Sequence, residues 1–302
     1  MRSHEAKQDE PRSLRTVALV VKKSEISILR ARRVSKATSA RLLLAHEEHL
    51  ASLRTVRQEL RWRGIRFTEH PVGEAPARAD LVLTVGGDGT LIEASHFVSG
   101  ATPVLGVNSA PSSSVGFLTG CRAPTFAETL DGLIAGWIQP RKVARLAVRI
   151  GKRQLPEPVL NDVLFCHENP AQTTRYHLFV PGAEEEQRSS GLWISTPAGS
   201  TAALRSAGGE PLPLEAQRFA FRIREPYAPP GSVVRIEGGV LDRGSSLKLR
   251  CLLAPGYVYI DGAHRRYPVP FDALLEIRLS RRPLALVRPD AAAGRRSHVS
   301  AR

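Results

Sequence analysis

Five consecutive residues, Gly86-Gly87-Asp88-Gly89-Thr90, are the strongest chemical signal in this 302-residue chain. They directly follow the apolar run Leu81–Val85 and precede a short stretch with helical character that begins at Leu91. Glycines let the backbone turn sharply and approach a phosphate closely, and the N–H groups at a helix start attract anions. A carboxylate beside a bound phosphate is unfavourable unless it accepts a proton from a hydroxyl nucleophile or helps hold a cation. The segment therefore predicts phosphoryl transfer, with Asp88 at the reacting centre.

A second segment, Ser190 to Ala203, combines an apolar strand with a polar turn in the order SGLWISTPAGSTAA. In this turn Gly199 permits a sharp bend, while Ser200 and Thr201 offer hydroxyl and N–H groups at a helix start. Such a turn can hydrogen-bond the edge of a base. Taken alone, either segment could also be an ordinary capped helix. The two together favour a ligand site.

These residues resemble the NAD kinase family. Gly-Gly-Asp-Gly-Thr after an apolar strand is shared by NAD kinases, by lipid kinases of the diacylglycerol and sphingosine type, and in part by phosphofructokinases. The segment Ser190–Ala203 resembles a long signature of NAD kinases that lipid kinases lack. Further segments that resemble the family follow its order, namely Leu105–Asn108, Ser114–Thr119 and Asn161-Asp162. The resemblance covers roughly residues 16–289.

The resemblance implies a role for each matched residue. Asp88 would accept the proton of the 2′-hydroxyl of the adenosine ribose as this oxygen attacks the terminal phosphorus of ATP. Asp162 would hold the ribose diol, since a carboxylate accepts from vicinal hydroxyls. Mg²⁺ or another divalent cation would come with ATP, because the sequence shows no carboxylate cage of its own. The predicted phosphate-binding residues are Gly86, Gly87, Gly89 and Thr90, and the predicted NAD-binding residues are Asn161, Asp162, Phe117, Thr196, Thr201 and Ala202.

The chain departs from the commonest form of the family signature at two positions. Ser190 stands where the signature usually has Asp, and Ala203 stands where it usually has Tyr. These features resemble the divergent branch that contains mitochondrial NAD kinases and plant NADH kinases. The preference between NAD and NADH, the donor (ATP or polyphosphate) and the roles of Ser190 and Ala203 stay open.

Three other functions compete with an NAD(H) kinase. A lipid or sphingoid kinase would share the first motif but would need an apolar slot for an acyl chain. An inactive nucleotide-binding regulator would bind NAD without making NADP. A nucleic-acid binder would rest only on the formal net charge of +14, which favours anionic partners in general. The chain shows no basic stripe studded with aromatic residues, so we expect no nucleic-acid partner.

The order of predicted elements indicates two domains. Strands alternating with helices predict an α/β domain with a mostly parallel sheet in the first part of the chain, and short strands predict a predominantly β domain after it. The predicted helix Ser39–Trp62 would bury the stripe Leu43, Leu50, Leu53, Val56 and Leu60. One of the later predicted strands is Ser232–Glu237. The predicted division is a tail (1–13), an α/β nucleotide-binding domain (14–122), a β-rich NAD-binding domain (123–268), a segment returning to the first domain (269–290) and a second tail (291–302).

Composition bears on the setting of the protein. No apolar run approaches the length of a membrane-spanning helix, and the first 15 residues lack the apolar stretch of a secretory signal. The three cysteines, Cys121, Cys166 and Cys251, are far apart and odd in number, which argues against a disulfide framework or a metal site. We therefore expect a cytoplasmic protein without a membrane partner. The resemblance adds the expectation of a homodimer or homotetramer.

Overall fold

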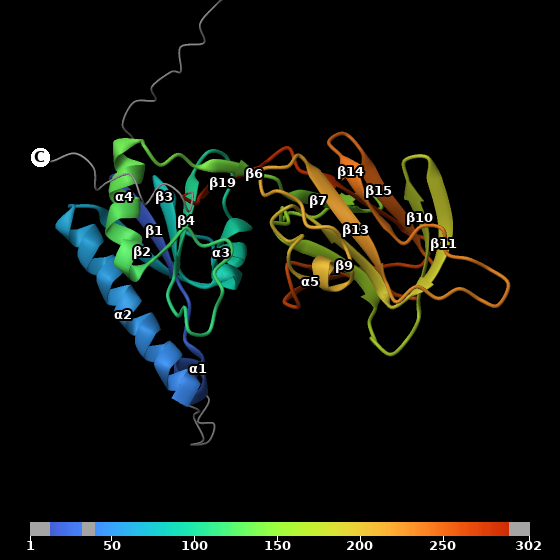
Figure 1. The fold of residues 1–302 in the computed structure, drawn as a ribbon, viewed down its shortest axis with the longest axis horizontal. Helices are drawn as coiled ribbons and strands as arrows, with labels where there is room; N and C mark the ends of the chain where they lie inside the picture. Colours follow the sequence, from blue (N-terminus) through green and yellow to red (C-terminus); the bar gives the residue numbers. More distant parts are fainter. Residues whose placement is uncertain (1–12, 32–39, 290–302) are drawn as a thin grey trace, which may run out of the picture. The chain divides into compact units, whose positions relative to one another are not determined.

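The computed structural model describes residues 13–31 and 40–289, and these form two compact units (Figure 1). The first unit runs through residue 141 and takes up the chain again from residue 285, while the second comprises residues 142–284. The predicted tails, residues 1–13 and 291–302, fall almost entirely outside the described residues.

The first unit is built on a seven-stranded sheet of order β2-β1-β3-β4-β19-β6, with the short β5 paired to β4. The strands from β2 through β19 in this order run parallel to one another, which confirms the predicted α/β class. Its elements are β1 (Thr16–Val21), α1 (Glu25–Ala31), α2 (Ala40–Trp62), β2 (Arg66–Pro71), β3 (Leu81–Gly86), α3 (Asp88–Ser95), β4 (Pro103–Asn108), β5 (Cys121–Arg122), the 3-10 turn η1 (Ala123–Thr125), α4 (Phe126–Ala135), β6 (Arg141–Val143) and β19 (Leu284–Val287).

Helices cover both faces of this sheet, which explains why β1, β3, β4 and β19 are continuous apolar runs. Leu83 and Leu105 lie on the face that shares one core with Leu60 of α2 and Phe126 of α4. The opposite face lies under α3, where Gly106 is so close to Leu91 that a Cβ on the glycine would lie 2.8 Å from the leucine Cδ1. Figure 1 shows α3 on the other side of the sheet from α4.

The predicted apolar stripe of α2 is only half correct. Leu53, Val56 and Leu60 are buried, but Leu43 and Leu50 are 40% and 38% exposed. The reason is length: at about 1.5 Å per residue the 23-residue helix is about 35 Å long, whereas a six-residue strand spans about 20 Å. The amino-terminal part of α2 therefore projects beyond the sheet, as Figure 1 shows.

The second unit is a sandwich of two six-stranded sheets, β11-β10-β15-β18-β7-β8 and β14-β13-β12-β9-β16-β17. Neighbouring strands in both sheets are antiparallel, and one apolar core takes side chains from both, which confirms the predicted β-rich class. Its elements are β7 (Leu146–Ile150), β8 (Arg153–Gln154), β9 (Asp162–His167), β10 (Thr174–Val180), β11 (Ala183–Ser189), β12 (Gly191–Ser195), α5 (Ala203–Ser206), β13 (Arg218–Arg224), β14 (Gly238–Asp242), β15 (Ser246–Cys251), β16 (Gly256–Ile260), β17 (Arg265–Val269) and β18 (Leu274–Leu279).

The units divide at different residues from the predicted boundaries of 122 and 268. Helix α4, which the sequence analysis does not predict, buries Phe126 and Leu130 in the core of the first unit. Strand β18 pairs with β15 and β7 in the second unit, so the chain returns to the first unit only at β19.

The predicted strand Ser232–Glu237 is wrong. These residues lie in an irregular segment, and Val233 is 80% exposed. The N–H groups of Arg235 and Ile236 donate to the Glu185 carboxylate, at 3.0 and 2.9 Å, rather than to a neighbouring strand. A side chain has replaced the sheet ladder as the hydrogen-bond acceptor.

The two halves of α2 should respond differently to truncation. Leu60→Ala removes a fully buried side chain and should lower the free energy of unfolding by about 2–5 kcal/mol. Leu43→Ala, the matched control on the exposed half, should change it by less than about 0.5 kcal/mol. Urea denaturation followed by circular dichroism measures both, and equal effects would contradict the assignment of the buried half.

Candidate active site

The glycine-rich segment leaves the sheet where its strand order changes direction. From β1 the chain goes to β2 on one side and then returns to β3 on the other. Ligands of open α/β sheets bind at the carboxyl ends of strands at such a switch point. Here β3 ends at Gly86 and α3 begins at Asp88, three residues before the predicted helix start at Leu91.

Two backbone N–H groups hold the carboxylate of Asp88. Its Oδ2 accepts from Phe117 and its Oδ1 accepts from Leu118, both at 2.7 Å. The N-cap residue of α3 is Gly87, and no side chain caps the helix. Asp88 is therefore not a helix-capping residue, which was the alternative interpretation of this segment. Each carboxylate oxygen has two acceptor sites, and Asp88 therefore keeps capacity for a substrate hydroxyl.

The three glycines around Asp88 have different surroundings. A Cβ on Gly86 would lie 2.1 Å from Thr90 Oγ1, and one on Gly87 would lie 2.7 Å from Ser114 Oγ. A Cβ on Gly89 would meet no atom within 4 Å. Packing thus excludes a side chain at Gly86, and at Gly87 the Ser114 hydroxyl would have to move, while Gly89 borders open space that a phosphate could fill. Thr90 is buried and its N–H donates to Gly87 O at 3.0 Å, so it supports the turn.

The loop after β4 presents the two N–H groups to Asp88. Gly116 has a φ of +70°, and a Cβ there would lie 2.4 Å from Asn108 Nδ2. The same Asn108 amide donates to Ser114 O at 3.0 Å, which closes the loop. The guanidinium of Arg288, just after β19, lies 4.7 Å from the centre of the Phe117 ring. No motif in the sequence marks Arg288, because only the pairing of β19 with β4 brings it to this loop.

In the second unit, Asn161 and Asp162 lie at the start of β9. The Asn161 side-chain amide donates to Asp162 Oδ2 at 3.0 Å. The carboxylate of Asp261 accepts the N–H groups of Leu160, Asn161 and Asp162 at 2.9, 2.7 and 3.0 Å. Asp261 is another residue that the sequence analysis missed, because no motif marks it.

The signature segment is bonded to the same backbone. The buried Thr196 hydroxyl donates to Leu160 O at 2.5 Å and accepts the N–H of Gly199 at 3.2 Å. A Cβ on Gly199 would lie 2.2 Å from Asn161 O, so only glycine fits. Because its hydroxyl is bonded to Leu160 and Gly199, the Thr196 side chain stabilises this turn.

The turn before α5 offers the accessible part of this segment. Helix α5 begins at Ala203, three residues after the predicted start at Ser200. Ser200 is buried, and its hydroxyl accepts the N–H of Leu212 at 2.8 Å. Thr201 is half-buried and Ala202 is exposed, so these two residues can contact a ligand.

Burial changes the acidity of Asp162. The residue is 6% exposed, and this desolvation, with the negative charge of Asp261 in addition, raises the pKa of its carboxyl to about 7. The group therefore titrates near neutral pH, and only its ionised form has two oxygens that both accept hydrogen bonds without donating one.

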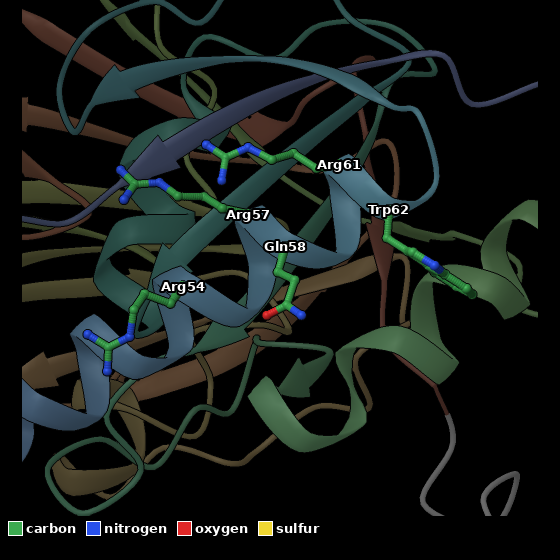
Figure 2. Close-up of a pocket in the computed structure, with 5 residues that line it drawn as sticks. All are labelled: Arg54, Arg57, Gln58, Arg61 and Trp62. Atoms are coloured by element: carbon green, nitrogen blue, oxygen red, sulfur yellow. The ribbon is translucent and has the colours of Figure 1, made fainter.

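Two surface hollows, of about 650 and 770 Å³, contain none of the predicted site residues. The first lies along α2, and Figure 2 shows Arg54, Arg57 and Arg61 extending to one side of the helix and Trp62 to the other. Glu69 already neutralises Arg57 through two hydrogen bonds of 2.7 and 2.6 Å.

Metal ligands do not cluster in the described part of the chain. Across residues 13–31 and 40–289, no group of three or more His, Cys, Asp or Glu side chains could hold a metal ion. Within the same residues, no helix is long and apolar enough to cross a membrane. The three cysteines are free and buried.

A glycine-lined strand exit that holds a carboxylate is the arrangement expected of an enzyme that transfers a phosphoryl group. Residues 12–138 match the ATP-NAD kinase N-terminal domain. A probable NADH kinase from Oryza sativa subsp. japonica is 33% identical over 270 residues, which are 81% of this chain and 82% of that protein. The chain belongs to the NAD kinase family, as the resemblance implied.

Solved structures of the family share the fold. An NAD kinase from Archaeoglobus fulgidus in complex with ATP has a TM-score of 0.69 at 18% identity and covers 91% of this chain and 94% of its own. Yeast NADH kinase complexed with NADH has a TM-score of 0.69 at 17% identity, with coverages of 94% and 85%.

The raised pKa of Asp162 predicts a pH-dependent stability. Between pH 3.8 and about 7 the folded chain keeps a proton that the unfolded chain releases, so this group makes the folded state less stable as pH rises. Asp162→Asn removes the effect. Its unfolding free energy minus that of the wild type should therefore increase with pH, at up to about 1.4 kcal/mol per pH unit. Urea denaturation from pH 5 to 8 measures this difference, and a flat difference would show that Asp162 ionises as freely as in a peptide.

Proposed function

We propose that this protein transfers the terminal phosphoryl group of ATP to the 2′-hydroxyl of the adenosine ribose of NAD or NADH, giving NADP or NADPH. Membership of the NAD kinase family supports this reaction, and relatives include a probable NADH kinase. The observation that carries it is the Asp88 carboxylate, held by two N–H groups at a glycine-lined strand exit.

Asp88 acts as the general base. Its two hydrogen bonds to Phe117 and Leu118 fix the carboxylate without side-chain rotation, so the proton acceptor is oriented before substrate arrives. When the 2′-oxygen attacks phosphorus, the proton passes to a carboxylate oxygen and the oxygen–phosphorus bond to ADP breaks. Positioning and charge neutralisation supply most of the rate in such transfers.

The backbone of residues 86–89 binds the phosphates of ATP. Gly89 borders open space, and the first N–H groups of α3 point out of the helix start as anion donors. Mg²⁺ enters as part of the MgATP substrate and spreads the charge of the transferring group. The cation of Arg288, beside Phe117, adds positive charge near the same loop.

Asn161, Asp162, Thr201 and Ala202 bind the adenosine part of NAD(H). Ionised Asp162 accepts from a ribose hydroxyl, and the Asn161 amide is held by Asp162 so that its oxygen can accept from a base amino group. Thr201 and Ala202 contribute accessible hydroxyl and backbone groups. Phe117 contributes through its backbone, and buried Thr196 supports the turn.

The alternatives fit less well. The relatives named above are NAD or NADH kinases, which leaves the lipid kinase and the inactive regulator without support. A homodimer or homotetramer and a cytoplasmic setting stay predictions, and light scattering of the purified protein tests the first of them.

The general base should be separable from folding. Asp88→Asn keeps one acceptor oxygen and the size of the side chain but cannot take a proton, so kcat should fall by roughly 10²–10⁴. A coupled assay of NADP and NADPH formation from NAD and NADH, with MgATP, measures this loss. The matched control is Glu128→Gln, which neutralises an exposed acid in the first turn of α4, and its kcat should stay within about twofold of wild type.

Two results would contradict the proposal. One is a loss below about tenfold in Asp88→Asn with unchanged circular dichroism, since this is too small for a general base. The other is a wild-type protein that binds NAD and MgATP but forms neither NADP nor NADPH.

A further inference from the structure

We propose that Asp261 is a positioning residue for the dinucleotide, which holds the backbone of Asn161 and Asp162 in the geometry that binds NAD(H). The inference rests on the proposed function, because it assigns a role to the segment that binds the adenosine. Asp261 itself is not required to touch the substrate.

Asp261 forms three side-chain hydrogen bonds and one backbone hydrogen bond to this one segment. Its Oδ1 accepts from Asn161 N at 2.7 Å and from Asp162 N at 3.0 Å, and its Oδ2 accepts from Leu160 N at 2.9 Å. Its own N–H donates to Asp162 O at 2.9 Å. One residue thus forms four hydrogen bonds to three consecutive residues about a hundred positions earlier in the chain.

The position of Asp261 explains how it reaches the segment. β16 pairs antiparallel with β9, and Ile260 lies opposite Val163. Asp261 follows the last residue of β16, and Asp162 is the first residue of β9, so the carboxylate extends the hydrogen bonding of this ladder past its end. The bonds to Leu160 and Asn161 organise residues that no strand fixes.

The backbone of Asp261 also indicates a specific requirement. Its φ is +51°, in the left-handed region that most side chains avoid, and Gly262 follows with a φ of +110°. Glycine would adopt this conformation at less cost, yet the chain carries a carboxylate there. The carboxylate also stands between two buried charged groups, since it repels the Asp162 carboxylate and attracts the Arg145 guanidinium. The four hydrogen bonds to residues 160–162 offset the cost of the left-handed backbone conformation.

The segment that Asp261 holds is also bonded to the signature segment Ser190–Ala203. The carbonyl of Asn161 accepts from Thr196 N at 3.0 Å, and the carbonyl of Leu160 accepts from the Thr196 hydroxyl. The turn at Gly199 packs directly against Asn161, since a Cβ on Gly199 would lie only 2.2 Å from Asn161 O. A shift of Asn161 would therefore displace this turn as well.

Asp261→Asn is the sharpest test. An amide has one acceptor oxygen, and its NH₂ group faces N–H donors, so at least one N–H loses its acceptor. We expect KM and Kd for NAD(H) to rise by about tenfold or more, with kcat changed by less than about threefold. Hydrogen exchange of the amides at 160–162 should become faster. Should this variant fold poorly, Asp261→Gly suits the positive φ and deletes the carboxylate, with the same expected split.

The matched control is Asp272→Asn. Asp272 is also a non-glycine residue with positive φ, +61°, in the same unit, and its carboxylate pairs with Arg250 at 3.0 Å on the surface. Its KM for NAD(H) should stay within about twofold of wild type.

Two outcomes overturn the inference, and a third overturns the proposed function on which it rests. An Asp261→Asn protein with unchanged KM and Kd, in an active enzyme, contradicts the positioning role even if hydrogen exchange accelerates. An equal rise of KM in Asp272→Asn shows a general loss of stability instead. A wild type that makes no NADP or NADPH contradicts the proposed function itself, which distinguishes that failure from the failure of Asp261 alone.

Discussion

The site in the first unit depends on the pair of hydrogen bonds from Phe117 and Leu118 to the Asp88 carboxylate. They join the exit of β3 to the loop after β4, two segments that sheet order places side by side. Without them a carboxylate in the first turn of α3 could rotate freely or cap the helix. Gly116, with its positive φ, and Gly86, which has no room for a side chain, shape the two segments so that the bonds can form.

The second unit also has a carboxylate that accepts hydrogen bonds from consecutive backbone N–H groups. There Asp261 accepts three consecutive N–H groups and fixes Asn161 and Asp162, while Thr196 and Gly199 lock the signature turn onto the same backbone. In both units, consecutive backbone N–H groups that have no partner strand donate to a carboxylate instead. The accessible groups of each site, such as Gly89 and Thr201, therefore stand on a backbone that is already ordered.

Much of the fold and part of the site could be predicted from the sequence. The apolar run Leu81–Val85 lies in strand β3, and the apolar part of the segment Ser190–Ala203 forms strand β12, because apolar runs bounded by polar residues have few other solutions. The exposure of the amino-terminal half of α2 could not be predicted, because the spacing of apolar residues shows which face of a helix is apolar. It does not show how long the sheet is that this face packs against. Asp261 was missed for a related reason: a lone acid after a strand carries no signal until the antiparallel partner, β9, is known.

The central claim is that the carboxylate of Asp88 receives the proton of the 2′-hydroxyl. The most direct measurement is the distance from the nearer Asp88 oxygen to the ribose 2′-oxygen, in a crystal structure of the protein with NAD and a non-hydrolysable ATP analogue. The account predicts about 2.6–3.2 Å, or one bridging water, with the bonds from Phe117 and Leu118 intact. A 2′-oxygen more than about 6 Å from both carboxylate oxygens, with no bridging water, would contradict it.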